Sequence, residues 1–492
     1  MSTDAAQHIR HPDRFFIGGA WVEPSSSARI DVRDSASEEV FLSVAEAQVE
    51  DVDRAVAAAR KAFDQGPWPR MTHAERAVWL NKIADVWTKR APDIADTWTR
   101  ESGVLHAVAK YAAVNPASTF RFHAGLAETF TWEEPHVTPD GLRAALVREP
   151  VGVVGAIIPW NAPNALMAYK SAAALIAGCT VVVKASPEAP AAGYLLAEIC
   201  EEIGLPEGVL NVVTADREVS ERLVRHPGVD KISFTGSTAA GRRIGSICGE
   251  RIARCTLELG GKSPAVILDD YDLGKAAQSI AGTARFLTGQ VCSSLTRLIV
   301  TRGRHDAFVD ALSSCFGKVK VGDPFDASSE MGPLAMERQR DRVEGYIAKG
   351  RQEGARLATG GGRPKHLERG YFIEPTVFAN VDNGSTIARE EIFGPVLSVI
   401  PADSEEHAIE IANDTIYGLN SSVFTNDPER AYAVGRRIRA GTVGHNAFKT
   451  DFSISFGGFK QSGIGREGGT EGMYPYLEAK TIIFDQKAAK PA

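Results

Sequence analysis

The chain has 492 residues, of which 44% are hydrophobic and 24% charged, and its formal net charge is −7. This length predicts about three domains, and the acidic balance with scattered Lys and Arg excludes a basic surface for nucleic acid. No apolar stretch reaches the length of a membrane span, the polar start lacks a signal core, and the eleven histidines show no metal-ligand spacing. Six cysteines without paired spacing favour a reducing compartment, so we expect a cytoplasmic protein.

The first 130 residues predict a hairpin followed by helices. Two apolar runs flank Gly18-Gly19, which indicates a turn between short strands. Residues 49–63 place Val52, Val56 and Ala59 on one helical face, with Asp51 elsewhere. Residues 74–102 read as a second helical region that breaks near Pro92.

Residues 129–150 have a different pattern. Two short segments flank Thr138-Pro139-Asp140-Gly141, and Asp-Gly is a strong hairpin signal. Residues 478–484 near the end of the chain predict a matching strand. The two pieces indicate an arm that leaves the globule; an ordinary surface hairpin is the alternative.

Residues 151–268 alternate between strands and helices. The strands expected are residues 151–158, 180–184, 209–213 and 231–234, and the helices are 166–176, 191–203, 219–225 and 239–248. Strands without polar alternation, separated by helices, predict a parallel sheet covered on both faces. Such a sheet binds a nucleotide at the carboxyl ends of its strands.

The second half repeats this alternation more loosely. Strands are expected at residues 298–300, 397–400 and 422–424, and helices at 305–316 and 338–350. We find no sequence repeat, and the glycine-rich segment 457–472 is not simple enough in composition to be a linker.

Two short motifs carry the chemistry. Leu257-Glu258-Leu259-Gly260-Gly261-Lys262 precedes Gly289-Gln290-Val291-Cys292, with Glu258 and Cys292 34 positions apart. Pro159-Trp160-Asn161 lies upstream and Glu391-Ile392-Phe393-Gly394-Pro395 downstream. In this order, from about Phe16 to about Phe484, the chain resembles the aldehyde dehydrogenase superfamily, of the hydrolytic, non-acylating type.

This resemblance implies an α/β fold with a Rossmann-variant cofactor domain, an α/β catalytic domain and a β-strand oligomerisation arm. The expected boundaries are 1–128 and 150–260 for the cofactor domain, 261–450 for the catalytic domain, and 129–149 with 470–492 for the arm. Residues 451–469 would be a connecting loop. The family's arm implies a homo-oligomer, a dimer or tetramer.

The catalytic residues expected are Cys292, Glu258, Asn161 and Lys170. A thiolate that adds to an aldehyde gives an oxyanion that expels hydride and leaves a thioester. Glu258 would activate the hydrolytic water; its alternative is a salt bridge with Lys262. The Asn161 amide would donate to the oxyanion, and Lys170 matches a family lysine thought to relay protons. The other five cysteines fit inert packing positions.

The cofactor site departs from the ordinary dinucleotide motif, because no Gly-x-Gly-x-x-Gly follows a strand. Phe234-Thr235-Gly236-Ser237 instead ends a strand and opens a helix, whose free N–H groups suit a diphosphate. The family usually has Glu three residues after Lys184, where it excludes a 2′-phosphate; here that position is Pro187. We expect NAD, with NADP tolerated. The binding residues implied are Ile157, Pro159, Trp160, Lys184, Gly236, Ser237, Gly241, Leu259, Glu391 and Phe393.

The resemblance also implies a substrate tunnel. Its expected lining residues are Ala162, Leu166, Tyr169, Phe286, Val291, Phe448, Phe452 and Phe456. None is charged, so a second carboxylate on the substrate would go unpaired, although Lys449 is close by. Ala162 stands where many relatives have a bulky aromatic residue. A small-molecule aldehyde that is apolar and medium-sized is expected: terpenoid such as geranial, aliphatic or aromatic.

Three alternatives compete with this interpretation. A coenzyme-A-acylating semialdehyde dehydrogenase would transfer the acyl group of the thioester to the thiol of coenzyme A. Such enzymes generally lack the base that Glu258 provides here. A catalytically silent structural relative would not need to keep Cys292, Glu258 and Asn161 together. A cysteine hydrolase would need a His–Asn partner set, which is not evident.

Overall fold

A sheet of eight strands forms the larger half of the molecule in the computed structural model, which describes residues 8–488. Its core strands are parallel, and antiparallel strands close both edges. In spatial order they are β19 (Gly463–Ile464), β11 (Arg254–Glu258), β10 (Lys231–Thr235), β7 (Val153–Ile157), β8 (Thr180–Ala185), β9 (Leu210–Thr214), β1 (Phe15–Ile17) and β2 (Ala20–Val22). The predicted parallel sheet and the N-terminal hairpin are confirmed.

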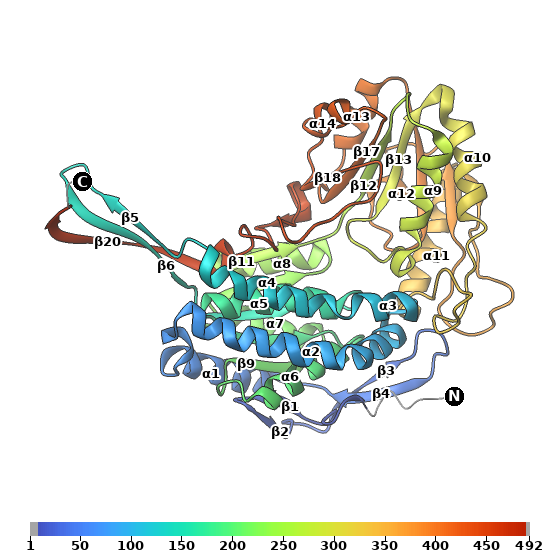
Figure 1. Ribbon diagram of the computed structural model, residues 1–492. Helices are drawn as coiled ribbons and strands as arrows, with labels where there is room; N and C mark the ends of the chain where they lie inside the picture. Colours follow the sequence, from blue (N-terminus) through green and yellow to red (C-terminus); the bar gives the residue numbers. More distant parts are fainter. Residues whose placement is uncertain (1–7, 489–492) are drawn as a thin grey trace.

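Helices cover both faces of this sheet (Figure 1). One face packs against α1 (Val49–Asp64), α7 (Arg217–Arg225) and α8 (Thr238–Arg251). The other packs against α2 (His73–Ser102), α4 (Asn115–Thr129), α5 (Pro163–Ala177) and α6 (Ala191–Ile203), with the short α3 (His106–Ala112) beside them. Successive strand residues alternate between the two cores, since Val182 faces one and its neighbours Val181 and Val183 face the other.

Two local predictions were wrong. Helix α2 does not break at Pro92 but is continuous over its 30 residues. Trp87, Ile94 and Trp98, on both sides of the proline, are buried in one core, and this packing outweighs the one hydrogen bond that a proline removes. Asp51, expected away from the buried face of α1, is fully buried: its carboxylate accepts hydrogen bonds from the Ser25 backbone N–H and hydroxyl at 2.9 and 2.7 Å.

A second sheet of seven strands forms the other half. In spatial order it contains β14 (Arg356–Thr359), β15 (Thr376–Ala379), β16 (Val396–Ala402), β13 (Leu295–Thr301), β12 (Ser263–Ile267), β17 (Asn420–Phe424) and β18 (Thr442–His445). Only β14 is antiparallel to its neighbour. Helices α9 (Leu273–Ala284) and α10 (His305–Phe316) cover one face. The other carries α11 (Glu337–Gln352), α12 (Thr386–Arg389), α13 (Glu405–Asn413) and α14 (Pro428–Gly435).

A three-stranded arm extends away from both halves (Figure 1). It consists of β5 (Glu133–Val137), β6 (Leu142–Pro150) and β20 (Leu477–Lys487), with β6 in the middle. The predicted pairing of the hairpin with the C-terminal strand is therefore confirmed. A separate small sheet joins β3 (Arg29–Arg33) to β4 (Val40–Ala45). Across residues 8–488, no helix combines the length and apolar character that crossing a membrane requires.

Candidate active site

The turn between β11 and β12 brings the predicted base, nucleophile and ribose-binding carboxylate close together. Glu258 ends β11 and Gly260-Gly261 follow it. A Cβ atom at Gly260 would lie 2.4 Å from Glu391 Oε2, and one at Gly261 would lie 2.3 Å from the Cys292 carbonyl oxygen. Side chains larger than hydrogen do not fit at either position. The Gly-Gly pair thus allows the loops of Cys292 and Glu391 to approach the turn after Glu258.

The thiol of Cys292 lies in a strongly negative environment. Cys292 is a free, partly exposed cysteine in the loop before β13. Burial of the sulfur and the negative charges of Glu391 and Glu258 raise the pKa of the thiol to about 12. The thiol is therefore protonated at neutral pH, and forming the reactive thiolate requires a proton acceptor or a positive charge brought close to the sulfur.

Glu258 is a buried carboxylate without a protein partner. Neither of its oxygens has a hydrogen-bond partner among the described residues, and the Nζ atom of Lys262 has none either. The salt bridge that was the alternative role of Glu258 is therefore not formed. Burial and the negative charge of Glu467 raise the pKa of Glu258 well above its ordinary value. The carboxylate therefore holds a proton more readily than an ordinary glutamate does.

Asn161 lies against the loop that carries the cysteine. We call residues 286–292 the nucleophile loop. The Asn161 side-chain amide donates a 2.9 Å hydrogen bond to the Gln290 carbonyl, and the Asn161 carbonyl accepts one from the Trp98 indole at 3.0 Å. The Gln290 side chain in turn accepts from the Ala335 backbone N–H at 3.0 Å. This chain of contacts holds the amide beside the segment that leads to Cys292.

Lys170 forms a buried ion pair with Glu467. Glu467 also accepts a 3.5 Å hydrogen bond from the Ser233 hydroxyl, and the Tyr476 hydroxyl donates to Ser233 Oγ at 3.1 Å. Sequence reasoning missed Glu467, which falls in the segment predicted to be a connecting loop. The only signal was its place in a glycine-rich stretch, since no spacing relates it to Lys170 almost 300 residues earlier.

The predicted cofactor residues lie at the carboxyl ends of the first sheet. Register pairs Ile157 with Lys184 and with Phe234, and Thr235 with Glu258. The strand order reverses direction between β7 and β10, which is where open parallel sheets bind ligands. The loops of Pro159-Trp160 and Gly236-Ser237 begin at this reversal.

Close contacts shape the start of α8. Ser237 caps the helix by accepting a 3.3 Å hydrogen bond from the Ala240 backbone N–H. A Cβ atom at Gly241 would lie 2.4 Å from a methyl carbon of Leu259, so the glycine allows the helix to approach the turn after β11. Lys184 is buried at the end of β8, and this burial lowers the pKa of its ammonium group to about 8. The helix start and a buried ammonium thus suit an anionic ligand.

Residues from both sheets meet at Trp160. Its indole lies edge-on to the Phe393 ring, with the ring centroids 5.4 Å apart and the planes at 87°. Phe393 has the left-handed backbone conformation, with φ of 64°, which is uncommon outside glycine. Glu391, two residues earlier, accepts a 3.1 Å hydrogen bond from the Gly261 backbone N–H. Burial raises the pKa of the Glu391 carboxyl group to about 7.

A carboxylate lies next to Pro187, the position at which the family pattern has Glu. Glu188 follows the proline, and its carboxylate accepts from the Ser186 hydroxyl and pairs with the Arg338 guanidinium. Its negative charge is the largest favourable influence on the buried Lys184 ammonium. Glu188 therefore brings negative charge close to Lys184 although it is one residue later than the family pattern.

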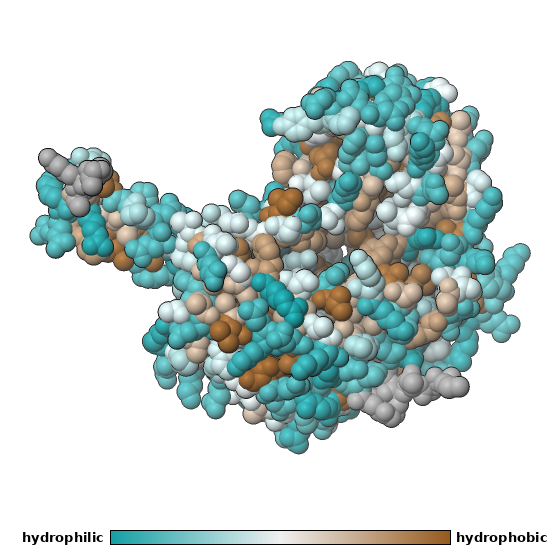
Figure 2. All heavy atoms as spheres, viewed as in Figure 1, coloured by the Kyte–Doolittle hydropathy of each residue, from teal (hydrophilic) through white to brown (hydrophobic). Residues whose placement is uncertain are grey.

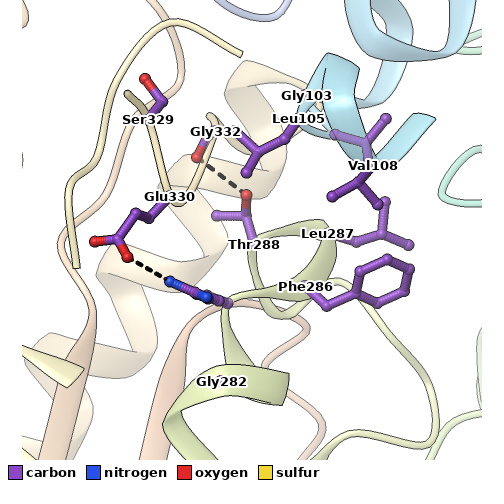
Figure 3. Close-up of a pocket in the computed structure, with 12 residues that line it drawn as sticks. Gly103, Leu105, Val108, Gly282, Phe286, Leu287, Thr288, Ser329, Glu330 and Gly332 are labelled. Atoms are coloured by element: carbon purple, nitrogen blue, oxygen red, sulfur yellow. Dashed lines mark hydrogen bonds and ion pairs between the residues drawn. The ribbon is translucent and has the colours of Figure 1, made fainter. Parts of the chain in front are cut away.

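The predicted tunnel residues fall into separate groups. Tyr169, Phe452 and Phe456 form one aromatic stack, with ring centroids 4.1 and 4.2 Å apart. Ala162 and Val291 are partly buried against the large core beneath α5, and Leu166 is also partly buried. Phe448 packs against the core beneath α9 instead, and Phe286 lines a different pocket (Figure 3). The structure thus brings part of the predicted lining together.

Hydrophobic side chains gather on the visible face where the two halves meet, whereas the second half is mostly hydrophilic (Figure 2). Within residues 8–488, no group of three or more His, Cys, Asp or Glu side chains is arranged to hold a metal ion.

Comparisons with known proteins agree with this geometry. A family model described as the aldehyde dehydrogenase family matches residues 21–482. The chain is 44% identical to geranial dehydrogenase of Castellaniella defragrans, over 97% of this chain and 98% of that protein. An aldehyde dehydrogenase of Mycobacterium tuberculosis crystallised with NAD+ superposes with a TM-score of 0.95 at 44% identity, over 98% of this chain and 100% of that one. A mutant of aldehyde dehydrogenase C of Pseudomonas syringae, complexed with NAD+ and octanal, gives 0.93 at 39% identity, over 96% and 98%.

Proposed function

The chain belongs to the aldehyde dehydrogenase family, and from this premise we propose that it oxidises an apolar aldehyde to the carboxylic acid through a covalent intermediate on Cys292. The observation that carries the proposal is the unpartnered, buried carboxylate of Glu258, whose charge acts on the Cys292 thiol. A carboxylate without a hydrogen-bond partner in such a place is costly. Proton transfer is a task that would use such a group.

The first half of the reaction forms and oxidises a thiohemiacetal. The Cys292 thiol releases its proton to solvent, and the sulfur adds to the carbonyl carbon. The resulting oxyanion accepts hydrogen bonds from the Asn161 side chain and the Cys292 backbone N–H. Collapse of this adduct expels a hydride and leaves a thioester. Each oxyanion donor contributes about 10²–10³ in rate in comparable sites.

The second half is hydrolysis. Glu258 takes a proton from water, the hydroxide attacks the thioester carbonyl, and the carboxylic acid leaves as the thiol of Cys292 is restored. Its raised pKa makes the carboxylate a stronger proton acceptor than an ordinary glutamate, which supports the role of general base. Lys170 and Glu467, paired and buried beyond it, would pass the proton onward.

NAD fits the residues at the carboxyl ends of the first sheet. When bound, the dinucleotide accepts the hydride, and its positively charged nicotinamide favours the Cys292 thiolate. Gly236, Ser237 and Gly241 at the start of α8 would hold the diphosphate, with Ile157 and Leu259 beside them, and Lys184 the adenosine ribose. Glu391 would hold the nicotinamide ribose, with Pro159, Trp160 and Phe393 packing near the nicotinamide. NAD is favoured over NADP because Glu188 places negative charge near Lys184.

The substrate proposed is an apolar, medium-sized aldehyde: terpenoid, aliphatic or aromatic. The aromatic stack of Tyr169, Phe452 and Phe456 offers an uncharged surface of the kind that binds such chains. The relatives named for geranial and crystallised with octanal support this class. The alternatives are a coenzyme-A-acylating enzyme and a catalytically silent relative. The unpartnered carboxylate of Glu258 supports neither, because the first generally lacks this base and the second does not need it.

The division of the chain also remains a proposal. We propose cofactor-binding segments 1–128 and 150–260, a catalytic segment 261–450, and an arm of 129–149 with 470–492. The arm presents exposed apolar side chains, Ile482 and Ile483 among them, on an outer strand. This supports assembly into a homo-oligomer. A cytoplasmic location remains a prediction from cysteine usage.

Rapid-quench and stopped-flow experiments with octanal test the covalent mechanism. Wild-type enzyme should show the octanoyl group on Cys292 by mass spectrometry. Cys292→Ala should abolish reduction of NAD, whereas Cys315→Ala, at another partly exposed thiol, should not. Glu258→Gln should release one equivalent of NADH and then stop at the acyl-enzyme. Normal steady turnover by Glu258→Gln, or octanoyl-CoA formed when coenzyme A is added, contradicts the proposal.

A further inference from the structure

A pocket of about 290 Å³ lies beside the beginning of the nucleophile loop, outside the site described above (Figure 3). Neither Cys292 nor Glu258 lines it, and Phe286 is the only predicted tunnel residue that does. Since a water molecule occupies about 30 Å³ in the liquid, the pocket has room for roughly ten heavy atoms. It is thus large enough for a small organic molecule.

The two sides of this pocket differ in polarity. Leu105, Val108, Phe286 and Leu287 supply apolar side chains on one side, and a polar wall faces them across the space (Figure 3). The Gly103 and Gly332 backbones approach each other so closely that a Cβ atom at Gly332 would lie 2.1 Å from the Gly103 carbonyl oxygen. This contact joins the halves of the molecule at the edge of the pocket.

The polar wall carries both signs of charge. Arg285 Nη1 lies 2.7 Å from Glu330 Oε1, and the other Glu330 oxygen accepts a 3.0 Å hydrogen bond from the Lys320 backbone N–H. Ser329 adds a hydroxyl. Because these two charges are paired, the wall offers no net charge to attract a carboxylate or an ammonium ligand. A neutral hydroxyl group suits this wall, because it accepts a hydrogen bond from the guanidinium and donates one to the carboxylate.

We propose that this pocket binds a primary alcohol with an apolar chain, in the size range of 1-octanol. The chain would lie on Phe286, Leu287 and Val108, with the hydroxyl beside the Arg285–Glu330 ion pair. The choice of an aliphatic chain rests on the proposed function, because two-electron oxidation of such an alcohol supplies the aldehyde. The alcohol would then be sensed next to the site that consumes its product.

The pocket adjoins a segment of unusual backbone. Leu287 and Thr288 both have positive φ, 47° and 54°, and the Thr288 hydroxyl donates a 3.0 Å hydrogen bond to the Gly332 carbonyl. Such residues keep a sparsely populated conformation only when their surroundings hold them. A ligand in contact with Leu287 and Thr288 would therefore change the conformational freedom of the nucleophile loop just before Cys292.

Gly282 offers a selective way to fill the pocket. It lines the pocket from α9, and a Cβ atom added to it would meet no other atom within 4 Å. Gly282→Ala is therefore tolerated sterically, whereas the longer side chain of Gly282→Leu occupies the space. Both replacements favour the helix over glycine, so they form a matched pair.

Isothermal calorimetry of 1-octanol with wild-type enzyme, Gly282→Ala and Gly282→Leu tests the site. The assay uses neither cofactor nor turnover, so its outcome is separate from the role of Cys292. We expect similar binding by wild type and Gly282→Ala, and binding weakened at least about tenfold in Gly282→Leu, which corresponds to 1.4 kcal/mol. Octanoate and octylammonium should bind the Gly282→Ala pocket more weakly than octanol.

A second readout uses the thiol itself. Octanol should change the rate at which iodoacetamide alkylates Cys292 in Gly282→Ala but not in Gly282→Leu. If Gly282→Leu does not fold, Val108→Phe fills the pocket from the opposite wall and replaces it. Equal octanol binding in filled and unfilled pockets, no octanol binding in wild type, or tighter binding of octanoate or octylammonium overturns the proposal.

Discussion

The side-chain amide of Asn161 donates a hydrogen bond to the Gln290 backbone carbonyl, 2.9 Å away and two residues before Cys292. An asparagine amide has two N–H groups. One is therefore committed to the nucleophile loop, and the other is available to the oxyanion in the proposed mechanism. The same bond that positions Asn161 also ties the loop to the start of α5.

Asn161→Ala should slow acylation because it removes both the oxyanion donor and this tie. We expect the pre-steady-state burst of NADH to slow by about 10²–10³, while the Kd for NAD changes little. Asn164→Ala is the control, since Asn164 is a buried asparagine one turn later whose side chain has no hydrogen-bond partner. A burst equally slow in both variants would mean that α5 packing, and not the donor, is responsible.

The pH dependence of turnover should respond to Glu467. Burial and the Glu467 charge raise the pKa of Glu258, and Glu258 must be ionised to act as a base. Turnover limited by hydrolysis therefore rises with pH through this raised pKa. Glu467→Gln removes the negative neighbour, so the pKa of Glu258 falls and the acidic limb of the kcat profile shifts to lower pH.

The matched control for this shift is Glu471→Gln, an exposed carboxylate four residues further on. Its kcat profile should follow the wild type across the acidic limb. An unchanged limb in Glu467→Gln, or a shift to higher pH, would show that Glu467 does not act on the base through its charge.

Cofactor preference should depend on Glu188. Its carboxylate is held by Ser186 and Arg338 and acts on the Lys184 ammonium. A 2′-phosphate close to it would meet repulsion of about 1 kcal/mol per charge pair, or roughly fivefold. Glu188→Gln should raise the ratio of kcat/KM for NADP to that for NAD by this amount. Glu202→Gln, an exposed glutamate on α6, should leave the ratio unchanged, and a wild-type preference for NADP would refute the premise.

Substrate size should depend on Ala162, a small, partly buried residue immediately before α5. A phenylalanine there would narrow the space near the nucleophile loop, and overpacking of this kind costs about 1–3 kcal/mol. Ala162→Phe should therefore lower kcat/KM for citral and octanal much more than for propanal. Ala162→Ser keeps the size and should keep the ranking. Equal losses for all three aldehydes in Ala162→Phe would place Ala162 outside the tunnel.

The parallel sheet is the part of the fold that sequence reasoning predicted best. Continuous apolar runs alternate with helices between Val153 and Thr235, and each run is a strand in the structure. Because parallel strands end at the same edge, this pattern alone places Ile157 and Lys184 along one edge. By contrast, short strands such as β12, β14 and β18 have no pattern that separates them from loops, and they were missed.

The two wrong predictions, the helix break at Pro92 and the placement of Asp51 away from the buried face, are both explained by tertiary contacts. Pro92 is a helix breaker by propensity, but a long apolar face on both sides of it keeps α2 continuous. Asp51 is polar by composition, yet it is buried because it satisfies the Ser25 backbone and hydroxyl. In both places a tertiary contact outweighs the local preference.

The order and spacing of short motifs along the chain, through the family resemblance that they carry, were enough to predict a thiol, a carboxylate and an amide as one catalytic set. The buried partner Glu467, the protonated state of Cys292, the tie from Asn161 to Gln290 and the pocket beside Phe286 came only from the folded molecule. Each depends on groups far apart in sequence, and the burial and charge that set their behaviour exist only once the two sheets pack together.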